Sequence, residues 1–421
     1  MSGQGYKKVA ENYYLYELNN GIRAVFTQTR KSHIVYCGFM VGVGSRDENE
    51  YTNGAAHFIE HGVFKGTEKR KSYQILNRIE SVGGELNAFT TRERTVYYTT
   101  TLKPYFNRSI ELLADIVFRP NFPQIEIEKE KSVIREEIEM YDDSPEESIF
   151  DEFNQFTFPG NSLGHNILGT QESVQKFTRK QIIDFWEQNY CTDNVVISIV
   201  GSLSPERVGK SLEKYLGDLP SSNRSRKPAQ KIIYKPFVKK IDRDFQQVHC
   251  IIGNKAYSNN DQRKYSLFLI NNILGGDWMS SRLNMSVREK HAYAYHVSSG
   301  FNSYRDTGTY SVQLGTDEKY LEKSIKLIQS EFNKIRNKKL NQVQLGRAKR
   351  QVISQVAMSN ENHSSLMQIR GKNILDYGRI VPKVEVIEKI NKINAEELME
   401  VANEVLEKSA MSTLIYNSGK H

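Results

Sequence analysis

The chain has 421 residues, more than a single hydrophobic core usually holds, which favours two domains. Its apolar content of 38% and its modest numbers of glycine and proline are typical of a globular protein and exclude a disordered or fibrous one. The formal net charge is +8, but basic and acidic residues are interspersed and no basic run carries interleaved aromatic residues. We therefore expect no nucleic acid among its partners.

The sequence carries no mark of a membrane or secretory protein. No apolar run approaches the roughly 20 residues that a membrane-spanning helix needs, and the N-terminus lacks the apolar stretch of a signal peptide. The three cysteines, Cys37, Cys191 and Cys250, are odd in number, far apart and outside any metal-binding motif. We expect buried thiols, no membrane partner, and a cytoplasmic protein.

The predicted elements follow one another in the order of an α+β fold. Residues 13–28 predict two strands joined at Asn20-Gly21, which is a strong hairpin signal, and residues 33–44 predict a third strand. A helix is predicted within residues 55–64, followed by strands within residues 83–102 and helices beyond them. Strands that follow one another without an intervening helix indicate antiparallel pairing and argue against a doubly wound α/β fold.

The chain also repeats itself at a spacing of about 213 residues. "VYC" at 35–37 recurs as "VHC" at 248–250, residues 98–113 resemble residues 310–328, and "EKSVIREE" pairs loosely with "AKRQVISQ". The matches occur in the same order in both halves. We predict two homologous domains from an internal duplication, at 1–220 and 241–421. Residues 221–240 would link them, because Pro, Ser, Lys and Arg are abundant there.

The segment "HFIEH" at 57–61 places two histidines and a glutamate on one helical face. Two imidazoles four residues apart can bind one metal ion, and Glu60 can then deprotonate a water beside it. This is the chemistry of H-E-x-x-H with the order reversed, the inverzincin pattern. From these residues alone, a helix that merely carries polar side chains stays open as the alternative.

A zinc site needs a third protein ligand, and the helix predicted near residues 124–143 offers one. At helical spacing, its buried stripe would consist of Glu130, Val133, Ile134, Glu137 and Ile138. Two carboxylates thus lie on a face that should be apolar, where an unpaired charge is costly. We predict Glu137 as the third ligand and Glu130 as a residue that supports a ligand or contacts substrate. Solvated acids at a helix end are the alternative.

The repeat supplies an internal control for this site. With the offset of 213, positions 57, 60 and 61 correspond to 270, 273 and 274, and with the later offset of 219, Glu137 corresponds to position 356. These counterparts are all apolar: Ile270, Ile273, Leu274 and Val356. The sequence therefore predicts a duplicated scaffold in which only the first half binds metal.

These motifs resemble those of the pitrilysin-type M16 zinc metallopeptidases, in particular the bacterial processing-protease type of roughly 400 residues. The likeness covers nearly the whole chain. In that family H-x-x-E-H is followed by a glutamate about 75 residues later, and here the interval from His61 to Glu137 is 137 − 61 = 76. The resemblance implies the LuxS/MPP-like metallohydrolase fold, in which each domain is a mainly antiparallel sheet packed with helices.

Two further segments carry the resemblance. Residues 275–299, "GGDWMSSRLNMSVREKHAYAYHVSS", are similar to a family segment whose arginine and tyrosine hold the substrate, which implies these roles for Arg288 and Tyr295. Residues 83–102 are similar to an edge strand beside the zinc that pairs with an extended peptide. The residues that would line this edge are Asn87, Ala88, Phe89 and Thr90. A paired interior strand is the alternative.

The implied function is zinc-dependent endopeptidase activity with one Zn²⁺ per chain, bound by His57, His61 and Glu137. Glu60 would act as general base, and Arg288 and Tyr295 would stabilise the oxyanion. The resemblance also implies an enclosed chamber for peptides and unfolded segments, and a homodimer in which the Arg/Tyr pair acts in cis or in trans. The alternatives are a non-catalytic core subunit and a presequence-processing peptidase.

Overall fold

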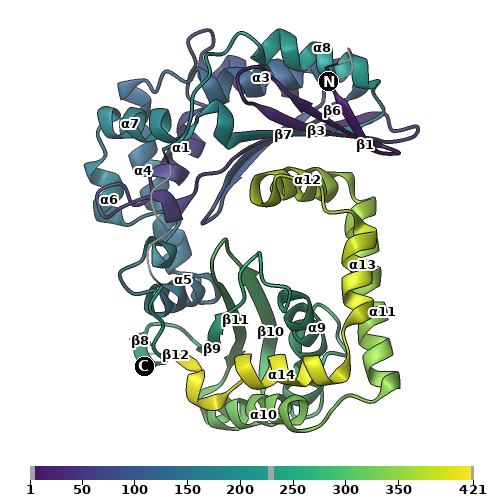
Figure 1. The fold of residues 1–421 in the computed structure, drawn as a ribbon. Coiled ribbons are helices and arrows are strands. Elements are labelled where there is room, and N and C mark those ends of the chain that lie inside the picture. Colours follow the sequence, from purple (N-terminus) through teal and green to yellow (C-terminus); the bar gives the residue numbers. More distant parts are fainter. Residues whose placement is uncertain (1–4, 226–231, 419–421) are drawn as a thin grey trace. The chain divides into compact units, whose positions relative to one another are not determined.

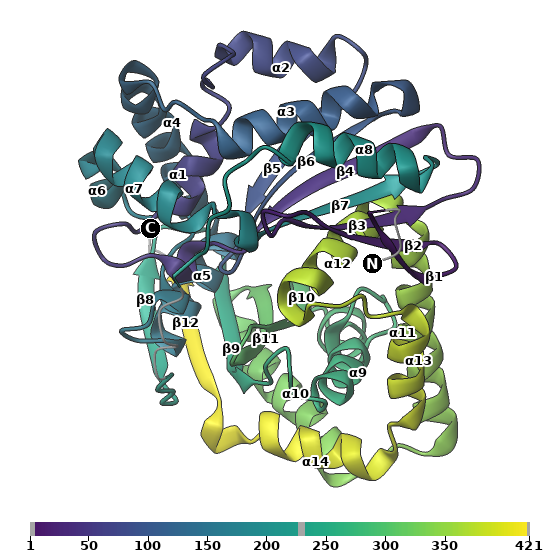
Figure 2. The same cartoon turned by 45° about the horizontal axis from the view of Figure 1, so that its top comes forward.

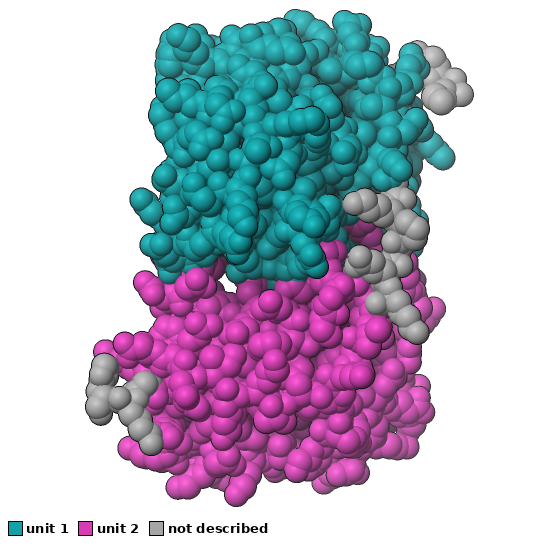
Figure 3. Space-filling model, turned by 90° about the vertical axis from the view of Figure 1, so that its left-hand side faces the viewer, with its two compact units in different colours: residues 1–139, 165–229, 359–381 teal, residues 140–164, 230–358, 382–421 magenta. Residues whose placement is uncertain are grey.

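The computed structural model describes residues 5–225 and 232–418, which divide into two compact units coloured in Figure 3. Unit 1 comprises residues 1–139, 165–229 and 359–381, and unit 2 comprises residues 140–164, 230–358 and 382–421. No described helix has the length and apolar character needed to cross a membrane.

The sheet of unit 1 contains seven strands within the described residues (Figures 1 and 2). Their spatial order is β1 (Lys7–Ala10), β2 (Tyr13–Glu17), β3 (Arg23–Gln28), β7 (Val195–Gly201), β4 (Ile34–Val41), β6 (Thr95–Leu102) and β5 (Glu85–Thr90). The predicted hairpin is confirmed, because β2 pairs antiparallel with β3 and Gly21 has a φ of 90°. Neighbouring strands are antiparallel except β3 and β7.

Helices cover both faces of this sheet. Figure 1 shows α3 (Phe106–Phe118) and α8 (Pro205–Leu216) on one face and α12 (His363–Tyr377) on the other. The remaining helices of unit 1 are α1 (Ala55–Gly62), α2 (Ser72–Glu80), α4 (Gln124–Asp142), α6 (Gln171–Lys176) and α7 (Arg179–Asn189). Short 3₁₀ turns occur at η1 (Ser45–Asp47), η2 (Lys103–Tyr105) and η4 (Thr192–Asn194).

Unit 2 repeats the plan with a smaller sheet. Its strands lie in the order β10 (Ala294–Ser303), β11 (Gly308–Thr316), β9 (Val248–Ala256), β12 (Ser412–Ser418) and β8 (Val238–Arg243), with β8 and β12 parallel. Its helices are α5 (Pro145–Thr157), α9 (Lys264–Gly275), α10 (Glu318–Asn337), α11 (Gln342–Glu361), α13 (Lys383–Lys392) and α14 (Ala395–Val405). Shorter turns are η3 (Ser162–Gly164), the π-helical η5 (Asn284–Glu289) and η6 (Lys408–Ala410).

The two halves of the duplication exchange one helix each. Helix α12 comes from the second half but packs on the sheet of unit 1, where Ser198 Oγ donates to the Met367 carbonyl at 2.7 Å. A side chain at Gly38 would collide with Met367, so the glycine permits this close approach. Conversely, α5 comes from the first half, and its Phe153 packs with Ile251 and Leu414 of unit 2.

This exchange makes both units discontinuous, whereas we predicted continuous domains at 1–220 and 241–421. A contact between segments far apart in the sequence leaves no periodic signal that could have indicated it. Of the predicted linker at 221–240, residues 226–231 lie outside the described residues, and β8 already begins at Val238. At the other end, Arg224 is anchored on unit 1 by an ion pair with Asp47 at 2.6 Å.

Candidate metal centre

Helix α1 carries the two histidines and the glutamate. It begins after Gly54, whose φ of 94° lies in the left-handed region that favours glycine. The apolar side chains of α1 are buried, and Phe58 packs edge-on against Phe177 at 5.5 Å between ring centroids. The ring centroids of His57 and His61 are 4.6 Å apart, so the two imidazoles lie side by side as the i, i+4 spacing predicts.

Helix α4 brings Glu137 to the same point. Glu137 Oε2 lies 3.7 Å from His57 Nε2 and 3.7 Å from His61 Nε2. All three potential ligand atoms lie within 4.8 Å of one another, and no second such group was found among the described residues. One nitrogen from each histidine and one carboxylate oxygen therefore converge on a single point.

This arrangement fits a zinc ion. In a tetrahedral site with bonds of about 2.0–2.1 Å, neighbouring ligand atoms are about 3.3 Å apart. The two distances from Glu137 Oε2 are 3.7 Å, so small side-chain movements would bring these atoms to that spacing. The donor set of two imidazoles and one carboxylate is a common catalytic set, which leaves the fourth position for water or substrate. His57 forms no hydrogen bond within the described residues, so its ring is not committed to another partner.

Glu130 holds His61 from behind. Its Oε1 lies 2.8 Å from His61 Nδ1, and its Oε2 forms an ion pair with Lys65 at 2.7 Å. The Glu130 side chain is only 3% exposed, so both oxygens of a buried carboxylate are satisfied. A carboxylate on the far nitrogen fixes the tautomer and orientation of a ligating histidine, which leaves Nε2 for the metal. The position of Glu130 agrees with the supporting role we predicted for it.

Glu60 faces the edge strand. It is buried, and its Oε2 accepts a hydrogen bond from Thr90 Oγ1 at 2.5 Å. Burial raises the pKa of Glu60, while the Thr90 hydroxyl and His61 lower it. Burial makes the Glu60 carboxylate a better proton acceptor, and the Thr90 hydroxyl limits this effect. Such a carboxylate can accept a proton and then release it.

The pKa values of the three candidate ligands are shifted in different directions. Burial and the neighbouring His61 lower the pKa of His57 to about 3, so this imidazole is neutral at pH 7 and available as a ligand. Burial also lowers the pKa of His61, but Glu130 outweighs this effect and the net shift is upward. Burial raises the pKa of Glu137.

Glu48 fixes the start of α1, a role that our sequence analysis missed. Its carboxylate is buried and accepts the backbone N–H groups of Gly54 and Ala56, each at 2.9 Å, and the Asn53 side chain at 3.1 Å. A carboxylate at a helix N-terminus pairs with donors that the helix itself leaves unsatisfied. An acid nine residues before the first histidine lies in a loop, where no periodicity marks it.

The counterparts in unit 2 are apolar, as the repeat predicted. Ile270 and Leu274 on α9 are completely buried in the core of unit 2, and Ile273 and Val356 pack against that core. The helix pair α9 and α11 therefore fills with hydrocarbon the positions that α1 and α4 fill with ligands.

The remaining predicted residues fall in two places. The Asn87–Thr90 segment lies in β5, the last strand of the unit 1 sheet, with β6 on one side and no strand on the other within the described residues. This confirms the edge position. Arg288 and Tyr295 belong to unit 2, where Arg288 is the next-to-last residue of η5 and Tyr295 on β10 is 69% exposed.

One predicted core position is wrong. Val133 is 46% exposed, whereas the buried stripe of α4 runs through Ile127, Glu130, Ile134 and Ile138. Val133 precedes Ile134 by one residue and so points about 100° away from it around the helix. The adjacent valine and isoleucine were both assigned to the stripe because they are equally apolar.

Comparison with known families and proteins agrees with this geometry. Residues 23–171 match the family model for insulinase (peptidase family M16), and residues 176–352 match the model for the peptidase M16 inactive domain. The chain is similar to the uncharacterised zinc protease YmxG of Bacillus subtilis, with 33% identity over 96% of this chain and 98% of that protein. An uncharacterised zinc protease of Rickettsia bellii is 32% identical with the same coverages.

Solved structures share the fold. A protease from Helicobacter pylori superimposes with a TM-score of 0.89 at 20% identity, covering 96% of this chain and 99% of that one. A peptidase M16 inactive domain structure from Pseudomonas fluorescens gives 0.88 at 21% identity, with 97% and 99% covered. At these identities the likeness shows the fold alone, and it confirms the predicted α+β architecture of two homologous domains.

Proposed function

This chain belongs to peptidase family M16, and from that premise we propose that it is a zinc-dependent metalloendopeptidase acting at His57, His61 and Glu137. The observation that carries the proposal is the convergence of these three side chains, with Glu60 on the same helix face and Glu130 behind His61. The family model for the second half is that of an inactive domain, which agrees with its apolar counterparts.

The reaction follows from the positions of the side chains. A zinc ion held by three ligands would supply Lewis acidity and a water acidified to about pKa 7. Glu60 accepts the proton of the attacking water and then delivers it to the leaving amine. Thr90 donates a hydrogen bond to Oε2 of Glu60 and so orients the carboxylate, which leaves Oε1 to accept the proton. Glu130 and Lys65 hold the His61 ring in place throughout.

The edge strand β5 gives a place for the substrate. Its free edge offers backbone N–H and C=O groups to an extended peptide, and Thr90 at its end touches the proposed base. Asn87 is exposed along the strand, whereas Phe89 packs on the side of the sheet that α12 covers. Main-chain pairing binds peptides with little dependence on sequence, which suits a peptidase acting on unfolded segments.

The finer parts of the proposal rest on the family resemblance. Arg288 and Tyr295 would stabilise the oxyanion and bind the substrate backbone, and both side chains are exposed. An enclosed chamber and a homodimer with one zinc per chain would complete the enzyme. A non-catalytic core subunit is the competing function, but every residue of the zinc motif is present in this chain.

The test compares the wild type with Glu60→Gln, which keeps the shape of the side chain but removes the base. We expect one zinc per chain in both proteins, cleavage of unstructured quenched peptides by the wild type, and a loss of about 10²–10⁴-fold in the variant. Glu136→Gln, on the exposed side of α4, is the matched control and should behave as wild type. If both proteins bind zinc and neither cleaves any member of a diverse peptide library, the core-subunit function replaces this one.

A further inference from the structure

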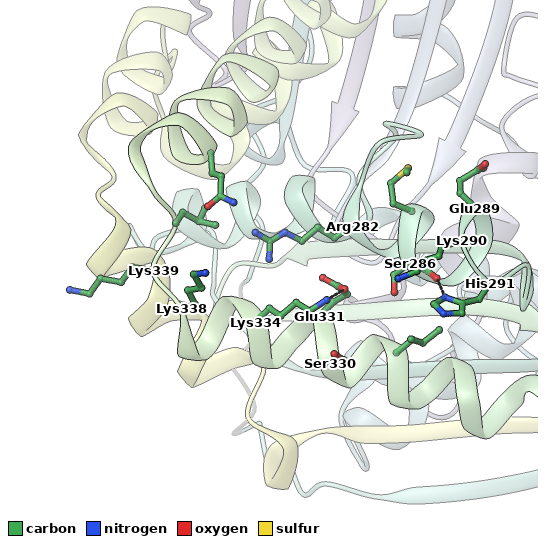
Figure 4. A pocket seen from close by; sticks show the side chains of 14 residues that line it. Arg282, Ser286, Glu289, Lys290, His291, Ser330, Glu331, Lys334, Lys338 and Lys339 are labelled. Atoms are coloured by element: carbon green, nitrogen blue, oxygen red, sulfur yellow. Dashed lines mark hydrogen bonds and ion pairs between the residues drawn. The ribbon is translucent and has the colours of Figure 1, made fainter.

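A cavity of about 930 Å³ lies in unit 2 (Figure 4). Its walls come from the segment around η5 and from α10 with the residues that follow it. In Figure 4, Arg282 reaches in from one wall, Glu331 and Lys334 come from α10, and His291 lies at the far end. The volume falls in the range of cavities that bind small molecules.

The walls carry an excess of positive charge. Five basic side chains line the cavity, namely Arg282, Lys290, Lys334, Lys338 and Lys339, against two acidic ones, Glu289 and Glu331. Two of the cations are already paired, because Lys334 contacts Glu331 at 2.6 Å and Lys339 contacts Glu396 at 2.8 Å. Arg282, Lys290 and Lys338 have no side-chain hydrogen bond or ion pair among the described residues. These three cations give the cavity its character.

Among these three cations, Arg282 gives the strongest indication of an anionic ligand. Its side chain is partly buried, and this burial lowers the pKa of its guanidinium. Glu331 attracts it electrostatically, but that carboxylate already pairs with Lys334. A half-buried guanidinium with unused donors is costly unless a partner accepts from it. Its planar fork matches phosphate and carboxylate oxygens.

The end of α10 gives a partial structural reason for some of the lysines. Cations near a helix C-terminus interact favourably with its dipole, and Lys334 and Lys338 lie there. Arg282 and Lys290 do not belong to this helix; they flank η5 on the opposite wall. A helix-dipole effect therefore does not explain Arg282 and Lys290, two of the five basic side chains.

We propose that this cavity binds a small, soluble, phosphorylated compound, with Arg282 as a bidentate donor and Lys338 and Lys290 as flanking cations. No phenylalanine, tyrosine or tryptophan is among the described lining residues, so nothing would stack on a nucleobase. This favours a compact non-aromatic phosphate over a nucleotide. The Nδ1–H of His291 donates to the Ser286 carbonyl at 2.7 Å, because a carbonyl oxygen can only accept. This leaves Nε2 for a ligand.

The test uses the full-length, zinc-loaded protein and fructose 1,6-bisphosphate as probe, with fructose as its phosphate-free match. Isothermal titration calorimetry should detect binding of the bisphosphate, weaker at higher salt, and none of fructose. Lys338→Glu should weaken binding by about 10-fold or more, since hydrogen bonds to charged groups are the strong ones. Arg282→Lys keeps the positive charge but loses the planar pair of donors, so the affinity for the bisphosphate should fall by about 3- to 10-fold.

Lys319→Glu is the matched control, because it makes the same charge change at the other end of α10 and should leave the affinity unchanged. Thermal unfolding of each variant shows that it is folded. Vesicles with an anionic phospholipid distinguish a lipid headgroup: competition by the bisphosphate would place that headgroup in the same cavity. The proposal is overturned if the bisphosphate does not bind at millimolar concentration, or if Lys338→Glu and Lys319→Glu reduce its affinity equally.

Discussion

The helix pairs α1/α4 and α9/α11 are the same piece of scaffold used in two ways. In unit 1 the facing side chains are two histidines and a glutamate whose ligand atoms lie within 4.8 Å of one another. In unit 2 the corresponding positions hold Ile270, Leu274 and Val356, which belong to a hydrophobic core or pack against it. The difference shows that the scaffold accepts apolar side chains at these positions, so it does not require the candidate ligands in order to fold.

The largest effect is expected when a candidate ligand in unit 1 is replaced by its apolar counterpart from unit 2. His61→Leu, or Glu137→Val, copies the counterpart residue and removes one of three ligands. We expect zinc content to fall well below one per chain and peptidase activity to fall more than about 10³-fold, because the Lewis acid and its water are lost together. Elemental analysis and cleavage of a quenched peptide measure the two effects. Glu136→Val makes the same change on the exposed side of α4 and should retain both; zinc retention by His61→Leu would contradict the assignment.

The reverse exchange tests the apolar side of the comparison. Leu274 is completely buried in a hydrophobic core, so Leu274→His places an imidazole among apolar side chains. We expect the free energy of unfolding to fall by about 3 kcal/mol, measured from the midpoint of urea unfolding. Phe268→His is the control on the same helix, because Phe268 is 38% exposed and should cost less than about 1 kcal/mol. Equal losses in the two variants would show that burial at position 274 is not what matters.

A smaller effect on zinc affinity is expected from Glu130, which contacts His61 but is not a candidate ligand. Glu130→Gln keeps the size of the side chain but weakens its hold on His61 and Lys65. The affinity for zinc should fall by about 10- to 100-fold, as for other carboxylates that support a ligating histidine. Competition with a chelator of known affinity measures this change, and Glu136→Gln serves as control. An unchanged zinc affinity would mean that α1 alone orients the imidazole.

The smallest effect concerns the base. Thr90→Val removes the hydroxyl that donates to Glu60 and lowers its pKa. Glu60 must be ionised to accept a proton, so the acid limb of the kcat/KM profile should move to higher pH, and the rate at pH 7 should fall about 2- to 5-fold. The pH profile is the measurement. Thr90→Ser retains the donor and should keep the wild-type profile; a shift in both variants would contradict this role of the hydroxyl.

The parts of the site that the sequence predicted are those carried by helical periodicity. His57, Glu60 and His61 share a face because of their spacing, and Glu137 was chosen because a carboxylate on a buried stripe needs a partner. The order of the strands and the duplication followed from turn signals and repeated motifs. All of these are regularities over a few residues, or copies of one another, and both can be read along a chain.

What could not be predicted depends on contacts between distant segments. Glu48 accepts a hydrogen bond from the backbone of α1 although it lies in a loop, and Lys65 forms an ion pair with Glu130. Arg282 belongs to the family-like segment at 275–299 but lines a cavity. The exchange of α5 and α12 belongs to the same class. Val133 failed for a different reason, since two adjacent apolar residues leave the phase of a helix ambiguous.

The exchanged helices also set an order of events during synthesis of the chain. The metal-binding residues have all been made once α4 is complete, yet Met40, Val96 and Val200 of the unit 1 sheet are covered by Leu366 and Met367 of α12. Because a nascent chain emerges from its N-terminus, that face of the sheet stays uncovered until α12 has also left the ribosome. The sheet of the first half is therefore made long before the helix that covers it, because that helix belongs to the second half of the duplication.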